Sequence, residues 1–215
     1  MGTTQVIPPG ASTLGRIEGA WENLNRTQRW WATVLAVFAG WACWEVGQAV
    51  PAHELGAISV VAMCAGSAAL VDAATERIPN TLLAVAATAV AAAVLAGVAG
   101  ELIATHGTPP GVSRGAAPAT GVLLGMLGAA VPMLVVRLQR GSGVGGLGMG
   151  DVKLAAVLGA AGGLVDARVG LATVFLAALA ASTFAALTHR RRMALGPWLF
   201  VAWLVALVVV VEVAS

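Results

Sequence analysis

The run TLLAVAATAVAAAVLAGVAGELIA, residues 81–104, is almost wholly apolar and contains one charged side chain, that of Glu101. An α-helix that spans a membrane needs about 20 consecutive, mostly apolar residues, and this run is long enough. Runs of the same kind occupy roughly residues 30–50, 56–73, 118–137, 152–165, 168–188 and 196–213. The sequence therefore predicts an all-α, polytopic membrane helical bundle of about seven transmembrane helices, or six if the fifth run is partly re-entrant.

The composition indicates a membrane protein and excludes a soluble one. Of the 215 residues, 59% are hydrophobic and only 10% are charged, and the mean hydropathy is +0.88. A soluble domain carries about 25% charged residues, so this chain has too little polar surface to cover a water-soluble globule. Residues 1–29 are polar and are predicted to form a tail, whereas residues 30–215 are predicted to form the transmembrane domain.

The fifth run, residues 152–165, is shorter than the others and rich in small residues, among them Ala155, Gly159 and Gly163. Small residues let the backbones of two helices approach each other closely in a membrane. We therefore expect this helix to pack inside the bundle rather than to face lipid.

The positively charged residues predict how the chain is oriented. If the N-terminus is cytoplasmic, all but two of the 12 Lys and Arg residues lie on the cytoplasmic side, and the exceptions are Arg114 and Arg168. Cytoplasmic loops carry the excess of Lys and Arg in membrane proteins, so the pattern predicts a cytoplasmic N-terminus. The run HRRR, residues 189–192, is then interpreted as a topology anchor, and no nucleic-acid partner is expected.

This topology brings together two acidic residues that are far apart in the sequence. Asp72 lies where the second run reaches the cytoplasmic face, and Asp151 lies where the fifth run leaves it. An ionisable residue at such a boundary is costly unless it is paired or hydrated, so it indicates a function. We expect the two carboxylates to meet at one membrane depth if their helices are neighbours.

Asp72 stands in the segment LVDAATERIPNTLL, residues 70–83. The preceding helix is expected to end after Asp72. The next helix is expected to begin at Pro79 and Asn80, because proline suits the first turn of a helix and asparagine caps it. A short, stiff turn of this kind would hold Asp72 in a fixed place. The alternative is an ordinary interfacial loop in which Asp72 is solvated.

Asp151 stands in the segment GLGMGDVKLAA, residues 146–156. Gly148 and Gly150 precede it and allow a backbone or an extended substrate to approach closely. Lys153 is expected either to reach the membrane interface or to moderate the charge of the carboxylate pair. The alternative is a flexible loop in which Asp151 only caps the helix that follows.

The glycine-rich run GSGVGGLGMG, residues 141–150, also fits the dinucleotide-binding pattern G-x-G-x-x-G at Gly143, Gly145 and Gly148. That pattern needs a β-strand before it, whereas a membrane span precedes it here, so we expect no nucleotide and no cofactor. The 3 histidines lack the spacing of metal ligands, and the 2 cysteines form no C-x-x-C pair. No metal is expected either.

The two aspartate motifs together resemble the type IV prepilin peptidase (prepilin leader peptidase) family, which are membrane aspartic proteases of the GxGD type. The signature G-x-G-D-x-K-L is matched by Gly148-Met149-Gly150-Asp151-Val152-Lys153-Leu154, and D-x-x-T-x-x-I-P-N is matched at Asp72, Thr75, Ile78, Pro79 and Asn80. A third segment of the family, F-G-P-F, is similar to Leu195-Gly196-Pro197-Trp198-Leu199. The resemblance covers about residues 56–213, with the three segments in the family's order and spacing.

The resemblance implies an aspartic endopeptidase, a hydrolase in which Asp72 and Asp151 activate water. It implies site-shaping roles for Gly148, Gly150, Lys153, Thr75, Pro79, Asn80, Gly196 and Pro197. The implied substrate is a type IV prepilin-like precursor, such as an Flp (tight-adherence) pilin. It would carry a short basic leader, a Gly before the cut and an apolar helix in the lipid bilayer. The implied location is the bacterial inner (cytoplasmic) membrane, with the active site facing the cytoplasm.

Two further expectations complete the interpretation. Longer family members carry an N-terminal cytosolic segment with paired C-x-x-C motifs, associated with N-methylation of the processed pilin. This chain shows no such motif, so it resembles the short form, and we expect no methyltransferase role. The alternatives are an ion-coupled transporter that uses Asp72 and Asp151 as a proton relay, or a non-catalytic subunit of a pilus or secretion machine. A scaffold would tolerate Asn at both aspartates, whereas a peptidase would tolerate it at neither.

Overall fold

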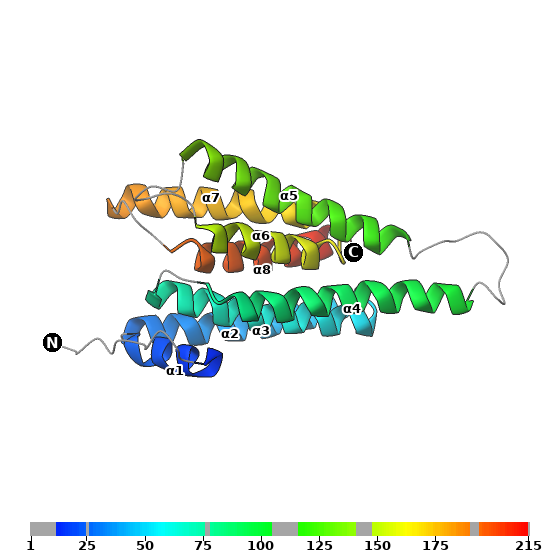
Figure 1. Cartoon of the computed structure of the whole chain (residues 1–215), viewed down its shortest axis with the longest axis horizontal. Coiled ribbons are helices and arrows are strands. Elements are labelled where there is room, and N and C mark those ends of the chain that lie inside the picture. The colour runs from blue at the N-terminus through cyan, green and yellow to red at the C-terminus, as the bar shows by residue number, and fades with distance from the viewer. Residues whose placement is uncertain are drawn as a thin grey trace.

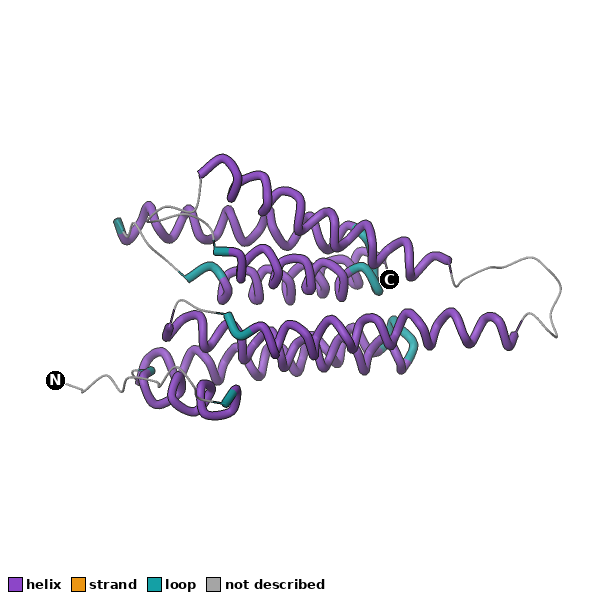
Figure 2. The backbone as a smooth tube through the Cα atoms, in the orientation of Figure 1, coloured by secondary structure: helices purple, strands orange, loops and turns teal. Residues whose placement is uncertain are grey.

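The computed structural model describes residues 12–24, 26–75, 78–104, 116–140, 148–189 and 194–214 (Figure 1). Within these ranges the regular structure is entirely helical (Figure 2). In chain order the helices are α1 (Thr13–Asn23), α2 (Arg26–Gly47), α3 (Ala52–Thr75), α4 (Asn80–Ala104), α5 (Ala116–Arg140), α6 (Met149–Gly162), α7 (Arg168–Thr188) and α8 (Gly196–Ala214). The predicted all-α polytopic membrane bundle is confirmed.

Each apolar run predicted from the sequence corresponds to one helix from α2 to α8. In the described part of the chain, α3, α4, α5, α7 and α8 are long and apolar enough to cross a membrane. With 14 residues, α6 is too short to do so. Although α2 has 22 residues, it is less apolar because it carries several tryptophans and Glu45. The chain is a multi-pass membrane protein in which α2 and α6 pack with the five apolar helices.

The helices from α2 to α8 run alternately in opposite directions along the long axis of the molecule (Figure 1). Helices α1 to α4 lie on one side of the bundle and α5 to α8 on the other. The two halves meet where α8 packs on α2 and α3 and where α6 packs on α3 and α4. As a result, the C-terminal end of α3 and the N-terminal ends of α4, α6 and α8 lie at the same end of the molecule, on the left in Figure 1.

Part of the predicted N-terminal tail is ordered as α1. The Ser12 side chain accepts a hydrogen bond of 3.2 Å from the backbone N–H of Gly15 and caps the start of this helix. At its end, the Arg29 side chain donates hydrogen bonds to the carbonyl oxygens of Trp21, Glu22 and Leu24, at 2.9 to 3.1 Å. The last carbonyl groups of a helix lack their usual partners in a following turn, and here the carbonyl of Trp21 also accepts a hydrogen bond from the backbone N–H of Leu24. Arg29 therefore fastens α1 to the first turn of α2.

The short helix α6 packs inside the bundle, as its small residues predict, and Leu154, Leu158 and Ala161 are fully buried. It lies directly against α5 through facing glycines. A Cβ atom on Gly125 would collide with the carbonyl oxygen of Gly159, and one on Gly159 would lie 2.7 Å from the Cβ of Ala129. Only glycine allows so close a backbone contact, which holds α6 at its depth in the bundle.

The end of α3 differs from the expectation that this helix stops after Asp72. The helix continues to Thr75, whose Oγ1 donates a hydrogen bond of 2.8 Å to the carbonyl oxygen of Val71. A threonine hydroxyl makes this bond to the preceding turn without leaving the helical conformation. Asp72 therefore lies within the last turn of α3 rather than at its final residue.

Candidate active site

Asp72, in the last turn of α3, is buried with 5% of its surface exposed. Its Oδ2 atom accepts a hydrogen bond of 3.0 Å from the backbone N–H of Gly196, the first residue of α8. The N-terminus of a helix has unpaired N–H groups and partial positive charge, both of which stabilise a carboxylate. The start of α8 thus provides a polar partner for Asp72 within an apolar bundle.

Asp151 lies in the first turn of α6 and is half-buried. Its Oδ2 atom accepts a hydrogen bond of 3.1 Å from the backbone N–H of Gly148, the residue before the helix. The capping role considered for Asp151 from the sequence is therefore present in the structure.

The two carboxyl groups lie close enough to affect each other electrostatically. Asp151 precedes the apolar part of α6 and lies outside the five membrane-spanning helices. Its pKa is raised from 3.8 to about 6, firstly because the group is buried and secondly because the negative charge of Asp72 disfavours a second charge nearby. The hydrogen bond from Gly148 acts in the opposite direction. Sequence analysis predicted that these two side chains would meet, and the fold brings them to one end of the bundle.

Two glycines of the sequence motifs stand where a side chain would not fit easily. A Cβ atom on Gly196 would lie 2.7 Å from Oδ2 of Asp72. One on Gly150 would lie 3.1 Å from the Cβ of Ile78, so Ile78 of the first aspartate motif packs against the glycine that precedes Asp151. Both contacts depend on space rather than on unusual backbone angles. The first joins the start of α8 to Asp72, and the second joins the two aspartate motifs.

Lys153 and Asn80 form a second link between the motifs. The Lys153 ammonium group donates a hydrogen bond of 3.1 Å to Oδ1 of Asn80, at the start of α4. Both residues are exposed. Lys153 was expected to reach the membrane interface or to moderate the carboxylate pair, but its contact is with Asn80. It ties the first turn of α6 to the first turn of α4.

The remaining predicted residues occupy varied positions around the aspartates. Pro79 is buried immediately before α4, and Thr75 bonds to its own helix. Pro197, which follows Gly196, lines a cavity described below. The glycine-rich residues 141–147 lie outside the described residues. Among the residues that are described, no group of three His, Cys, Asp or Glu side chains is arranged to hold a metal ion.

A comparison with family profiles matches residues 58–188 to the type IV leader peptidase family. The chain belongs to this family. The matched range contains both Asp72 and Asp151, together with Thr75, Asn80 and Lys153. A comparison with curated proteins and with solved structures finds no significant match.

Membership of the leader peptidase family establishes the general activity of the chain. It is a peptidase, hence a hydrolase, that lies in a lipid membrane and acts on a precursor polypeptide. The family match begins at residue 58, within α3. Helices α1 and α2 therefore lie before the matched range, and Gly196 and Pro197 lie after it.

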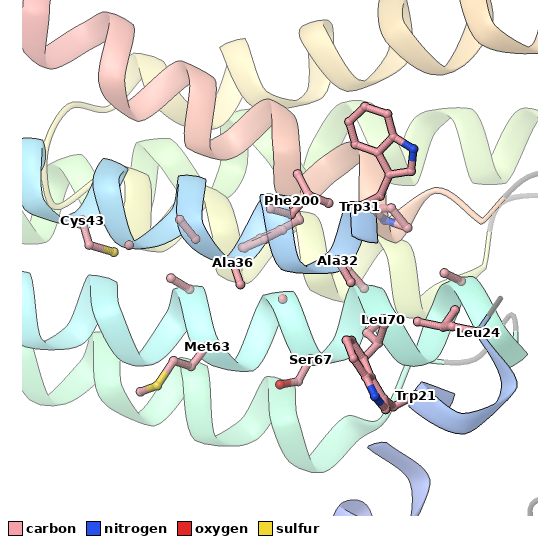
Figure 3. A pocket seen from close by; sticks show the side chains of 18 of the residues that line it. Trp21, Leu24, Trp31, Ala32, Ala36, Cys43, Met63, Ser67, Leu70 and Phe200 are labelled. Carbon is pink, nitrogen blue, oxygen red and sulfur yellow. The ribbon is translucent and has the colours of Figure 1, made fainter. Parts of the chain in front are cut away.

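This leader peptidase also contains an apolar cavity of about 790 Å³ (Figure 3), which the sequence did not reveal. Ala73, the residue after Asp72, is part of its lining. The cavity lies between α2 and α3, with α1 and α8 at one end. The available signal was the spacing of Ala32, Ala36 and Gly40 on one face of α2. Small residues at such intervals also occur in helices that pack tightly against a neighbour, so the spacing alone did not identify a cavity.

Proposed function

We propose that this member of the leader peptidase family is an aspartic endopeptidase in which Asp72 and Asp151 form the catalytic pair. Its proposed substrate is a type IV prepilin-like precursor, such as an Flp-type pilin, from which it removes a short basic leader. The observation that supports the proposal best is the placement of the two carboxyl groups at one end of the bundle, where burial and, secondly, the negative charge of Asp72 raise the pKa of Asp151 to about 6.

The proposed chemistry follows from two carboxyl groups that share one proton, because ionising both is costly. The ionised carboxylate accepts a proton from a water molecule, whose oxygen attacks the scissile carbonyl carbon. The protonated carboxyl donates a hydrogen bond to the carbonyl oxygen, and the C–N bond breaks as the leaving nitrogen accepts a proton. The pair acts as a coupled unit, so neither role is assigned to one residue.

The surrounding residues support this chemistry by holding the pair in place. The N–H of Gly196 fixes one oxygen of Asp72, and the N–H of Gly148 fixes one oxygen of Asp151. Fixed donors of this kind reduce the reorganisation needed during the reaction. We propose hydrolysis alone for this chain, without transfer of a methyl group to the product.

The proposed location is the bacterial inner membrane, with the aspartate end of the bundle facing the cytoplasm. The distribution of Lys and Arg in the sequence supports this orientation. A leader that is basic would remain on the cytoplasmic side for the same reason. The active site would then lie on the side of the membrane where the leader is held.

Co-expression with a candidate precursor tests the proposal, with leader removal followed by a shift in gel mobility. The substitutions Asp72→Asn and Asp151→Asn keep the size of the side chain but remove its charge. Each is expected to reduce processing by at least about 100-fold, while the protein is still inserted in the membrane. Asp166→Asn is the matched control, because Asp166 lies in the α6–α7 turn and accepts a hydrogen bond from the N–H of Arg168.

Processing at the wild-type rate in either Asp72→Asn or Asp151→Asn would refute the catalytic pair. Loss of processing in Asp166→Asn as well would indicate that the assay reports folding rather than chemistry. Membrane insertion is checked by the amount of each variant in the membrane fraction.

A further inference from the structure

The apolar cavity that ends at Ala73, the residue after Asp72, is a groove between helices rather than a closed void. Its walls are α2 and α3, which run side by side in Figure 3, with Ala32, Ala36 and Cys43 on the first and Met63, Ser67 and Leu70 on the second. Trp31 and Met63 are 59% and 66% exposed. Because side chains in the lining reach the surface, the groove opens sideways into the surrounding bilayer.

Both walls are lined by small side chains at helical intervals. On α2 these are Ala32, Ala36, Ala39, Gly40 and Cys43, and on α3 they are Ser59, Ala62, Gly66, Ala69 and Ala73. Small residues at intervals of three and four allow another helix to approach closely. Here they face a cavity of about 790 Å³, so the two helices leave space between them instead of filling it with their own side chains.

The groove ends at the candidate active site. Ala73 and Pro197 line it, and each is the next residue after a member of the Asp72–Gly196 hydrogen bond. At the same end, Trp21 and Leu24 from the end of α1 complete the lining. From Ser59 to Ala73, the groove follows about 21 Å of α3 at 1.5 Å per residue. A polypeptide that lies in it would arrive beside Asp72.

We propose that this groove docks one apolar helix of the peptide substrate, and that α1 and α2 form the wall that selects it. The inference rests on the proposed function, because the docked segment is the part of the precursor that adjoins the scissile bond. The apolar lining matches an apolar helix within the bilayer, and the end of the groove at Ala73 and Pro197, the chain neighbours of Asp72 and Gly196, favours a peptide over a lipid chain. Both α1 and α2 precede the family match, so this wall is a feature of the chain beyond that match.

Arg29 is the residue that holds the wall together at the active-site end. Its hydrogen bonds to the last carbonyls of α1 and its position over the Trp21 ring, 5.9 Å from the ring centroid, keep Trp21 and Leu24 at the end of the groove. The indole would then contact the first turn of the docked helix, next to the bond to be cleaved.

Photo-crosslinking tests the occupant directly. The probe is a synthetic precursor with a Lys- and Arg-rich leader, a Gly before the scissile bond and an apolar helix of about 20 residues. Benzoylphenylalanine replaces Ala36, which lines the groove, or its neighbour Val37, which is 69% exposed and does not. The Asp151→Asn background prevents cleavage, so the readout is binding. We expect crosslinks to the apolar segment at least about tenfold stronger from position 36 than from position 37.

Equal crosslinking from the two positions would overturn the inference. So would crosslinks from position 36 that reach only lipid or a second copy of the chain. Because this measurement needs no catalysis, it remains informative if the proposed catalytic pair is wrong.

A kinetic test fills the groove without disturbing the fold. A Cβ atom on Gly40 would meet nothing within 4 Å, and the same holds for Gly56, which lies on α3 outside the groove. Gly40→Leu is expected to raise KM for the synthetic precursor about tenfold with a change in kcat below about twofold, whereas Gly56→Leu leaves both near wild type. If the wild type cleaves the precursor and the two variants have equal KM values, the groove is not the docking site. If the wild type cleaves nothing, the proposed function fails instead.

Discussion

The backbone N–H of Gly196 donates a hydrogen bond of 3.0 Å to Oδ2 of Asp72 and so joins the start of α8 to the end of α3. The contact leaves no room for a side chain, since a Cβ atom at position 196 would lie 2.7 Å from that oxygen and 3.3 Å from the Cβ of Asp72. In the proposed mechanism Gly196 is therefore a positioning residue, which fixes the carboxylate without taking part in the chemistry.

Gly196→Ala is expected to lower kcat by about 10- to 100-fold, because a displacement of a catalytic group by about 1 Å costs that much. The methyl group would push the Asp72 carboxylate aside, and a terminal side-chain atom moves more easily than a backbone. The melting temperature should therefore change little. Gly56→Ala, at a position with open space, serves as the control in the same kinetic and thermal assays. Full activity of Gly196→Ala would show that the position of this oxygen does not matter.

The pH dependence of activity follows from the carboxyl group of Asp151. Its raised pKa of about 6 means that the pair retains one proton up to about that pH and loses it above. The proposed mechanism needs that proton, so kcat/KM in the solubilised enzyme should fall up to tenfold per pH unit as the pH rises beyond about 6. A value of kcat/KM that increases with pH through this range would contradict the mechanism.

The same pKa shift predicts how stability depends on pH. A carboxyl group whose pKa is higher in the folded state favours folding when it is protonated. This contribution is complete below the ordinary pKa of 3.8 and is lost as the pH rises through about 6. The wild type loses this contribution between pH 4 and pH 7, whereas Asp151→Asn does not have it. Relative to its melting temperature at pH 4, the variant should therefore be more stable at pH 7 than the wild type is. Identical pH profiles of melting temperature would contradict the shift.

The hydrogen bond between Lys153 and Asn80 predicts coupled effects on activity. Both side chains are exposed, so the bond should contribute less than about 1 kcal/mol to stability. Lys153→Met should reduce kcat/KM by about 2- to 5-fold, consistent with a loss of that size, because α6 and α4 are held less firmly beside Asp151. Asn80→Ala should have the same effect, and the double variant should be no worse than either single one. Additive losses would show that the two residues act separately.

The sequence predicted the helices and the placement of Asp72 and Asp151 at one end of the bundle (Figure 1), because both follow from apolar length and alternating direction. For example, the run at 81–104 corresponds to α4 at Asn80–Ala104. The hydrogen-bond partner of Asp72 could not be predicted in the same way. It is the backbone N–H of Gly196, and a backbone group leaves no mark in the residue types of the sequence. The order of α1 was missed for a similar reason, since it depends on Arg29 reaching three carbonyl groups from a different helix.

The groove was harder still to predict, because the small residues that line α2 and α3 would look the same in a tightly packed pair. The facing glycines of α5 and α6 illustrate the point. There the backbones of Gly125 and Gly159 do touch, and the space is closed. Which of these outcomes occurs depends on how the other helices hold the pair apart or together, and this tertiary information is absent from a local pattern.

The close contact of α5 and α6 also predicts where the bundle is least tolerant of added volume. Gly159→Leu would force the side chain against Gly125 and Ala129, and overpacking of this kind costs about 1–3 kcal/mol. We expect a lower melting temperature and lower activity, because α6 carries Asp151 in its first turn. The matched control is Gly100→Leu on α4, where a Cβ atom meets nothing within 4 Å and the melting temperature should stay near that of the wild type. If both variants melt at the wild-type temperature, α5 and α6 are not held together by their glycines, and the depth of Asp151 is set by other contacts of α6.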